Sequence, residues 1–402
     1  MASSRVTLRP LWASATARAI VRAWRELTGG SGVRDPERRT LVACSGGADS
    51  SALLLALGTR PGNVVAAHVV HDLRPRREAL RDAARVRGLA RALGVAYVQA
   101  EVRVRGVAGN AEANARAARY AALVRLARAH GCRYVCTAHH ADDLAETVLM
   151  RLLRGSGPRG LAGMRGTRGL ADGVTLVRPM LGVTRMQGEA LCTRAGWSWS
   201  EDATNRDTTR LRAALRARVL PVLAEIAPGY QARVARSAGL LDACARLLRG
   251  RARRLLPANH ATGGTCELDR ARVRRTPEIV AGEAVRLAHT RVGGGTGADR
   301  VSQRVLAQVV RAARDGVGGT RVFSVGGVRI EVTRERVTLR AIGRDRAATR
   351  GGSAGRPRRR SRASGSAGAG STRRTPSGRA RAGASAAGAG TAGRTRRPSR
   401  SR

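Results

Sequence analysis

Short apolar runs alternate with longer helical patterns between residues 41 and 153. We predict strands over residues 41–44, 64–70, 96–104 and 133–138, and helices over residues 51–58, 77–93, 111–130 and 142–154. This alternation predicts an α/β fold, doubly wound around a mainly parallel sheet. Ligands of such sheets bind beyond the carboxyl ends of the strands. Three segments fall at those ends and are therefore candidates for a site: residues 45–50, 68–72 and 138–143.

The first of these segments is a glycine turn, Ser45-Gly46-Gly47-Ala48-Asp49-Ser50. Paired glycines allow backbone N–H groups to close around an anion, and the following helix adds the positive end of its dipole. Ser45 and Ser50 can donate hydroxyl hydrogen bonds, and Asp49 can act on a metal ion or on the same amides. The turn therefore predicts a phosphate cradle. The alternative is a plain turn in which Asp49 or Ser50 caps the helix.

A second segment places acidic residues after a pair of histidines, His139 and His140. On a helix Glu146 lies four residues from Asp142 and three from Asp143, so these carboxylates can share one side. Oxygen ligands of this kind, together with substrate phosphates, suit Mg²⁺. The segment thus predicts a magnesium–nucleotide site opposite the cradle. The alternative is a set of acids that only complements the helix dipole.

All 75 basic residues are arginine, and the formal net charge is +47. The absence of lysine excludes a Schiff-base lysine and a Walker-type phosphate lysine. Residues 344–402 carry 17 arginines and one acid, so the remainder of the chain is also strongly basic. This charge predicts a polyanionic partner such as RNA. For the tail itself, salt-sensitive RNA affinity and a passive effect of base composition are the two alternatives.

Six scattered cysteines form no C-x-x-C pair. This pattern predicts small buried apolar residues in a reducing compartment rather than a disulfide scaffold. No apolar leader or membrane-span pattern is seen, so we expect a cytoplasmic protein without a membrane partner.

The rest of the chain is expected to be mostly helical. Residues 155–180 are predicted to form a glycine-rich loop, followed by helices over 184–196 and 211–223, the second ending near Pro221. Further helices are expected over 228–314, and short strands over 322–325, 328–332 and 337–339. The expected domains are an N-terminal helical extension (1–38), a catalytic domain (39–222), a helical accessory region ending in strands (223–343) and a disordered tail (344–402).

The cradle resembles the PP-loop of the N-type ATP pyrophosphatase superfamily, and further motifs resemble the tRNA(Ile)-lysidine synthetase family. Seven motifs occur in the family's order across residues 41–221, whereas residues 222–340 resemble the family only loosely. After the cradle they are His68 to Arg74; Glu112 with Ala115-Arg116 and Ala118-Arg119-Tyr120; residues 137–164; Arg178-Pro179-Met180-Leu181; Trp199-Ser200-Glu201-Asp202 with Asn205; and Arg212, Arg216 and Leu220-Pro221.

The resemblance implies an adenine nucleotide alpha hydrolase-like fold and a defined reaction. In that family ATP adenylates the wobble cytidine of a CAU-anticodon isoleucine tRNA, and free lysine then displaces AMP to give lysidine. The residues it implies for ATP are Ser45, Gly46, Gly47, Ala48, Asp49 and Ser50. Those it implies for catalysis are His140, Asp142, Asp143 and Glu146, with Asp49 and Asp142 as the candidate Mg²⁺ ligands. Those it implies for tRNA or phosphate contacts are Arg116, Arg119, Arg154, Arg212 and Arg216. A homodimer is a further expectation.

Two departures from the family pattern stand near the implied site. Leu144 replaces a frequent glutamine, and Ala213 replaces the asparagine of an Arg-Asn pair, while Arg212, Arg216 and Arg218 remain as an RNA-facing set. Two other functions stay open. One is a PP-loop tRNA thiolase, which needs a reactive cysteine set such as Cys132 and Cys136. The other is a non-catalytic, arginine-rich RNA-binding protein.

Overall fold

The computed structural model describes residues 9–29, 38–73, 75–200, 211–258, 264–293, 301–315 and 319–342. Every element described below belongs to one compact unit, Met1–Gly343. The tail expected over residues 344–402 lies outside the described residues, and so do Arg74, Glu201, Asp202 and Asn205 of the family motifs.

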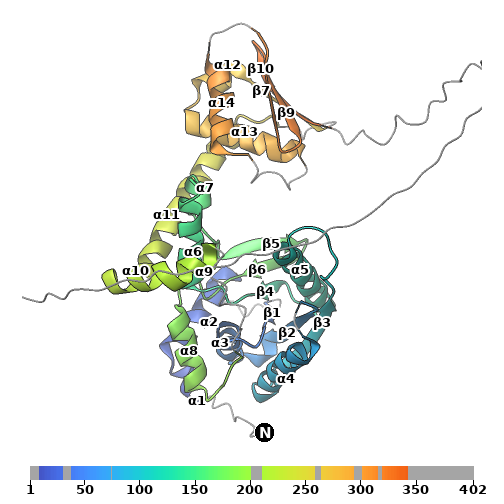
Figure 1. The fold of residues 1–402 in the computed structure, drawn as a ribbon, viewed down its shortest axis with the longest axis vertical. Coiled ribbons are helices and arrows are strands. Elements are labelled where there is room, and N and C mark those ends of the chain that lie inside the picture. The colour runs from blue at the N-terminus through green and yellow to red at the C-terminus, as the bar shows by residue number, and fades with distance from the viewer. Residues whose placement is uncertain are drawn as a thin grey trace, which may run out of the picture. The chain divides into compact units, whose positions relative to one another are not determined.

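A six-stranded sheet in the order β3-β2-β1-β4-β6-β5 organises the first part of the chain (Figure 1). All neighbouring pairs are parallel except β5 with β6, so the predicted mainly parallel sheet is confirmed. The central strand is buried on both faces, with Leu41 and Val42 inaccessible to solvent, as expected for a sheet covered by helices on both sides. The strands are β1 (Thr40–Ala43), β2 (Val64–His71), β3 (Ala96–Val102), β4 (Tyr134–Cys136), β5 (Thr167–Ala171) and β6 (Val174–Val177).

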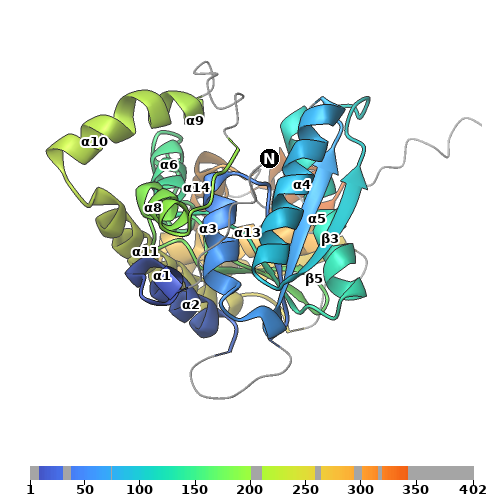
Figure 2. The ribbon, with the colours of Figure 1, turned by 90° about the horizontal axis from the view of Figure 1, so that it is seen from below.

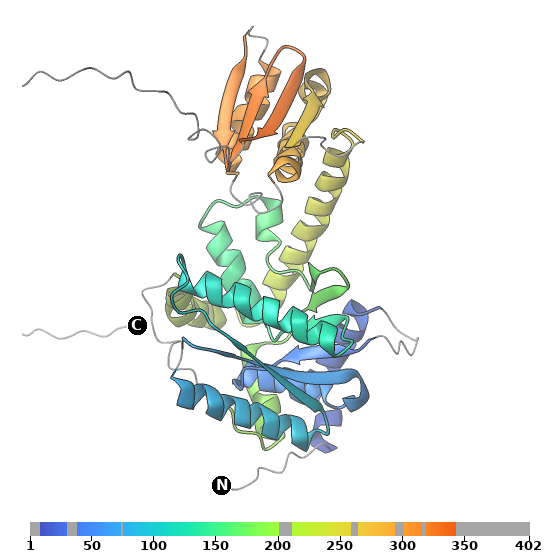
Figure 3. The same ribbon diagram turned by 90° about the vertical axis from the view of Figure 1, so that its right-hand side faces the viewer.

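Helices cover both faces of this sheet through two apolar clusters. One cluster joins Leu53–Leu57 of α3 to Ile20, Leu89 and Leu191, and the other joins Leu123 of α5 to strand residues such as Val65. Figures 2 and 3 show α4 and α5 on opposite sides of the strands. The helices are α1 (Arg9–Trp12), α2 (Ala15–Leu27), α3 (Ala48–Leu57), the 3₁₀ turn Pro61–Asn63, α4 (Arg76–Ala92), α5 (Ala111–Ala129), α6 (Ala141–Leu152) and α8 (Arg185–Arg194).

The loop predicted over residues 155–180 is wrong. The segment forms α7 (Pro158–Leu161) and the β5–β6 hairpin, which turns at Gly173 with a φ of +75°. Val174–Val177 is an apolar run whose Leu176 and Val177 are fully buried, and burial of this run adds β6 to the sheet beside β4. The glycine-rich flanks concealed the run. The antiparallel strand β5 pairs with β6 and forms one edge of the sheet.

The predicted end of a helix near Pro221 is also wrong. The chain continues through α9 (Leu211–Ala214), a π-helical turn over Leu215–Val219 and α10 (Leu220–Ile226). Proline has no N–H to donate, and its ring collides with the carbonyl one α-helical turn earlier. The wider π turn accommodates Pro221, so the helix passes it instead of stopping.

The remaining described residues form a long helix and a second sheet. The sheet is antiparallel in the order β7-β10-β9-β8, and the predicted turn at Gly326-Gly327 is confirmed with both residues at positive φ. Strand β7 was not predicted: only Cys266 and Leu268 of its five residues are buried. The elements are α11 (Tyr230–Arg253), β7 (Thr265–Asp269), α12 (Arg270–Arg275), α13 (Glu278–Val292), α14 (Gln303–Arg314), β8 (Arg321–Val325), β9 (Val328–Val332) and β10 (Arg336–Ala341).

Within the described ranges, no helix combines the length and the apolar character needed to cross a bilayer.

Candidate functional site

The glycine turn leaves β1 and enters α3 as a loop with an uncapped helix end. Gly46 has a φ of +92°, and Gly47 occupies the N-cap position, where no side chain bonds to the first turn. The alternative with Asp49 or Ser50 as the cap is therefore wrong. The first N–H groups of α3 have no capping side chain, which is the arrangement that binds anions at helix N-termini.

Ser50 holds this loop in shape. Its hydroxyl accepts from the backbone N–H of Ser45 at 3.1 Å, donates to the carbonyl of Gly47 at 3.1 Å and lies 3.1 Å from the hydroxyl of Ser45. A segment far along the chain closes the outer side, because the backbone N–H of Ser200 donates to the carbonyl of Gly46 at 3.0 Å. The cradle is thus fixed before any ligand enters.

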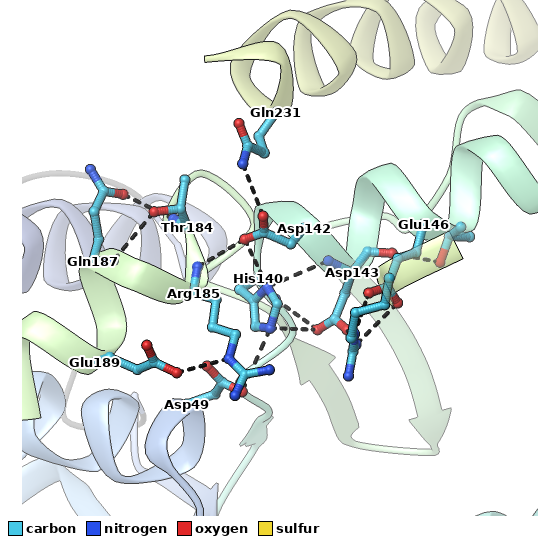
Figure 4. Close-up of polar contacts among 12 residues, drawn as sticks. Asp49, His140, Asp142, Asp143, Glu146, Thr184, Arg185, Gln187, Glu189 and Gln231 are labelled. Carbon is cyan, nitrogen blue, oxygen red and sulfur yellow. Dashed lines mark hydrogen bonds and ion pairs between the residues drawn. The ribbon is translucent and has the colours of Figure 1, made fainter. Parts of the chain in front are cut away.

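His140 lies at the centre of the acidic residues (Figure 4). It is the N-cap residue of α6, and its ring is buried. Its Nε2 is 3.6 Å from Asp49 Oδ2 and 3.5 Å from Asp143 Oδ2, while its Nδ1 is 3.4 Å from Asp142 Oδ2. The end of β4 and the start of α3 therefore meet at this ring, as the shared strand-end location predicted.

The two neighbouring histidines have opposite electrostatic surroundings. Burial alone lowers the pKa of His140, but the carboxylates of Asp142, Asp49 and Asp143 outweigh it and raise the pKa to about 10. For His139, burial together with Arg178 and Arg116 lowers the pKa to about 3. The surroundings of His140 therefore favour its protonated form, and those of His139 favour the neutral form.

This raised pKa predicts a pH-dependent stability. The protonated ring stabilises the fold fully below its ordinary pKa of 6.5, and that contribution is lost as the pH rises toward 10. Between pH 7 and 9.5, the free energy of unfolding of the wild-type protein should therefore fall more than that of the variant His140→Asn. Urea unfolding of both proteins at the two pH values measures the difference. Equal losses would show that His140 is neutral in the folded state.

Asp142 faces away from the other acids of α6. One carboxylate oxygen accepts from the backbone N–H of Arg185 at 2.8 Å, and the other accepts from Gln231 at 2.9 Å. Burial opposes ionisation of Asp142, but its hydrogen bonds to His140 and Gln231 lower its pKa. Figure 4 shows these partners arriving from α8 and α11. The sequence did not predict these partners, because they lie 43 and 89 residues away along the chain and Gln231 belongs to no recognisable local motif.

Asp143 and Glu146 instead share two arginines. The fully buried carboxylate of Glu146 accepts from Arg212 Nε at 2.8 Å and from Arg216 Nε at 2.6 Å. Arg216 Nη2 also lies 3.2 Å from Asp143 Oδ1. The predicted pairing of Asp143 with Glu146 on one helix side is thus observed, whereas Asp142 and Glu146 have separate partners. Arg212 and Arg216, which were predicted to contact tRNA or phosphate, are therefore bonded to carboxylates of the protein in this structure.

The other predicted arginines lie beside this centre. Arg116 and Arg119 of α5 stand over the ring of Tyr120, with their guanidinium carbons 5.2 Å and 5.8 Å from its centroid. Arg154 is exposed just after α6 and lines a cleft with Arg116. Arg168 and Arg178, which sequence analysis did not select as site residues, lie in the same cleft. Arg168 was hidden by the loop prediction for its segment.

Asp49 is the carboxylate whose environment best fits a divalent cation. Its Oδ1 atom is buried and has no hydrogen-bond partner among the described residues, whereas both oxygens of Asp142 are occupied. The described residues contain no group of three or more His, Cys, Asp or Glu side chains arranged to hold a metal ion. A magnesium ion held by one carboxylate and by substrate phosphates is compatible with this arrangement.

Comparison with known proteins identifies the family. The ATP_bind_3 family of PP-loop domains matches residues 17–223, about half of the chain. A tRNA(Ile)-lysidine synthase from Salinispora arenicola is 42% identical over 236 residues, which cover 56% of this chain and 69% of the relative. The chain belongs to the PP-loop family of tRNA(Ile)-lysidine synthases. The matched region includes the cradle, His140 and all four carboxylates of the site.

The share of each relative that the match covers varies within the family. The synthase from Deinococcus deserti is 43% identical over 246 residues, covering 60% of this chain but 44% of the relative. That from Bordetella bronchiseptica is 44% identical over 220 residues, covering 52% of this chain and 62% of the relative. The chain thus spans about half to two thirds of the length of these family members.

Among solved structures, the U34-tRNA thiolase NcsA from Methanococcus maripaludis with its [4Fe-4S] cluster is 17% identical, with a TM-score of 0.44. The alignment covers 56% of this chain and 79% of the thiolase. A likeness of this degree has no bearing on function.

Proposed function

We propose that this protein uses ATP to join free L-lysine to carbon 2 of the wobble cytidine of a CAU-anticodon isoleucine tRNA. The product, lysidine, converts the codon specificity from AUG to AUA. The observation that carries the proposal is the meeting of the uncapped cradle of α3 with His140 and the acids of α6 at one sheet edge. The family membership of the chain supports the same reaction.

The proposed reaction has two steps. The cytidine oxygen on carbon 2 attacks the α-phosphorus of ATP, and pyrophosphate leaves. The lysine amine then attacks carbon 2, the carbon–oxygen bond breaks, AMP leaves, and the amine loses a proton. Gly46, Gly47 and Ala48 supply the backbone of the cradle for the ATP phosphates, and Ser45 and Ser50 fix its shape. Asp49 would hold Mg²⁺, which would neutralise charge on the ATP phosphates.

The acidic residues divide their roles in this proposal. His140 contacts the carboxylates of Asp49 and Asp143 and holds them in place. Asp142 orients this ring and links it to α8 and α11. Asp143 is bound less tightly by arginine than Glu146 is, since its nearest arginine contact is 3.2 Å and that of Glu146 is 2.6 Å, and we assign it to the lysine ammonium.

The test is the incorporation of radiolabelled lysine into RNA. Purified protein is incubated with ATP, labelled lysine and isoleucine tRNA bearing CAU, and a synthase from one of the relatives serves as positive control. We expect label in the RNA that depends on ATP and is absent when the anticodon is changed. An unlabelled RNA under conditions where the control works would refute the proposal. It would also leave the non-catalytic RNA-binding function as the better description.

The cysteines do not support the thiolase alternative. Cys44, Cys132 and Cys136 are buried, and burial raises the pKa of each thiol, which disfavours the reactive thiolate. The described residues also contain no cysteine cluster fit to hold a metal centre.

The double variant Cys132→Ala, Cys136→Ala should therefore retain lysine incorporation within about twofold of the wild-type rate, because alanine keeps both sites apolar and small. Circular dichroism at the assay temperature controls for folding. A double variant that is folded but inactive would show that one of these thiols takes part in the reaction.

A further inference from the structure

Four arginines gather around one tyrosine at the edge of the sheet beyond the acids. The guanidinium carbons of Arg116, Arg119 and Arg168 lie 5.2, 5.8 and 5.3 Å from the centroid of the Tyr120 ring. The fourth, Arg178, directly follows β6 and is 6% exposed. We call these four residues the arginine cluster.

The topology explains why they meet. Helix α5 follows β3, so its first turns lie at the carboxyl edge of the parallel strands, and they carry Arg116 and Arg119. Strand β5 is antiparallel, so its second residue, Arg168, pairs with Leu176 near the carboxyl end of β6. The cluster therefore occupies the same edge as the cradle and His140, on the side of β6 and β5.

The cluster has positive charge without matching acids. In the part of the chain that the structure describes, no ion pair joins any of its members to a carboxylate. Arg178 donates from Nη1 to the carbonyl of Arg165 at 2.7 Å, but its buried Nε has no partner there. Burying the guanidinium of Arg178 without a counter-ion is costly, whereas Arg116, Arg119 and Arg168 are exposed. Such an uncompensated cluster is typical of a site that receives an anion.

A cleft gives an anion access to the cluster. Its volume is about 1650 Å³, and Arg116, Arg168 and Arg178 line it together with Arg151, Arg154 and Arg165. Its acidic lining residues are Glu278 and Glu283, and Glu283 is paired with Arg286. A space of this size and charge suits a polynucleotide better than an isolated small anion.

The position separates this site from the cradle. The cradle follows β1, whereas Arg178 follows β6 and Arg168 lies on β5, two and three strands away. At about 4.8 Å for each strand, roughly 10–14 Å lie between them. We infer that Arg168 and Arg178 complete a site for a backbone phosphate of the RNA substrate, separate from the ATP phosphates, with Arg116 and Arg119, for which the family resemblance already implies such contacts. This inference rests on the proposed function and assigns its RNA a point of contact.

The test compares binding of two ligands to Arg168→Ala. The RNA probe is a labelled stem-loop with a CAU anticodon, measured by fluorescence anisotropy without ATP or lysine, and the second probe is ATP with Mg²⁺, measured by calorimetry. Arg91→Ala is the matched control, because Arg91 is exposed in the last turn of α4, at the opposite edge of the sheet. Arg168→Lys keeps the charge and loses the planar group.

We expect Arg168→Ala to bind the stem-loop about tenfold more weakly than Arg91→Ala at 0.1 M salt. The slope of log K for RNA binding against log salt concentration should also be smaller in magnitude by about 0.7, the value expected for the loss of one phosphate contact to a single strand. Arg168→Lys should restore the salt dependence, and ATP affinity should stay within twofold in every variant.

Equal RNA binding by Arg168→Ala and Arg91→Ala would overturn the inference. So would a loss confined to ATP binding, which would assign the cluster to the nucleotide, or wild-type protein that does not bind the stem-loop. Failure of the proposed function is a separate result, because it is detected by lysine incorporation in the wild-type protein and not by RNA affinity.

Discussion

Glu146→Gln is expected to reduce lysine incorporation at least a hundredfold and to lower the free energy of unfolding by about 3 kcal/mol. The carboxylate of Glu146 is fully buried and accepts hydrogen bonds from both Arg212 and Arg216. Glutamine has nearly the same shape, but it offers one acceptor oxygen, and its NH₂ group faces a guanidinium. The arginines then lose their counter-ion, and Asp143 is drawn toward them and away from His140. Urea unfolding and initial rates measure the two effects.

Glu331→Gln is the control for this variant. It removes a carboxylate that pairs with Arg329 at 2.7 Å on the solvent-facing side of β9, and exposed pairs of this kind contribute about 0–1 kcal/mol. Its stability and activity should therefore remain close to those of the wild-type protein. If Glu146→Gln behaved like Glu331→Gln, the contacts of Asp143 and Glu146 with Arg212 and Arg216 would have no part in holding the site.

Gly46→Ala is expected to lower activity about a hundredfold while costing only about 1–2 kcal/mol of stability. Gly46 has a φ of +92°, a conformation that strains any residue with a β-carbon. The site has room for the methyl group, since the nearest atoms, in Asp82, would lie 3.7 Å from it. The effect should therefore come from the backbone, which shifts to relieve strain and turns the cradle N–H groups away from the phosphates.

Gly94→Ala separates strain from function. Gly94 has a φ of +65°, and a β-carbon there would meet nothing within 4 Å. A backbone cost of the same kind, though smaller, is thus imposed away from the cradle, and ATP-dependent incorporation of lysine should persist. Comparable activity losses in Gly46→Ala and Gly94→Ala would indicate general destabilisation as the cause.

Local sequence predicted those parts of the site that lie within a single turn. The cradle and the acids of α6 could be located because each is a strand end followed by a helix start. The roles of the acids could not be separated in this way, because their partners come from distant elements. Asp142 is bonded to Gln231, 89 residues away, and Glu146 to Arg216, 70 residues away.

The errors in the fold have a similar origin. The glycines around Val174–Val177 predicted a loop, yet burial of that short run against β4 decided the structure. Pro221 predicted a helix end, yet a widened turn carried the helix past it. Only the first error affected the prediction of the site, because the hairpin carries Arg168, whereas Arg212 and Arg216 lie within the helix predicted over residues 211–223.

The grouping of side chains around His140 gives this edge of the sheet two neighbouring regions of opposite sign. The four carboxylates of Asp49, Asp142, Asp143 and Glu146 lie around His140 with the two guanidinium groups of Arg212 and Arg216, so acidic side chains outnumber arginines at this centre. The arginine cluster beside it has an excess of positive charge. In a chain with a net charge of +47, this small anionic island repels a polynucleotide backbone and attracts an amine. The two proposed substrates, an RNA and an amine, have opposite charges and can therefore approach one edge without competing for the same place.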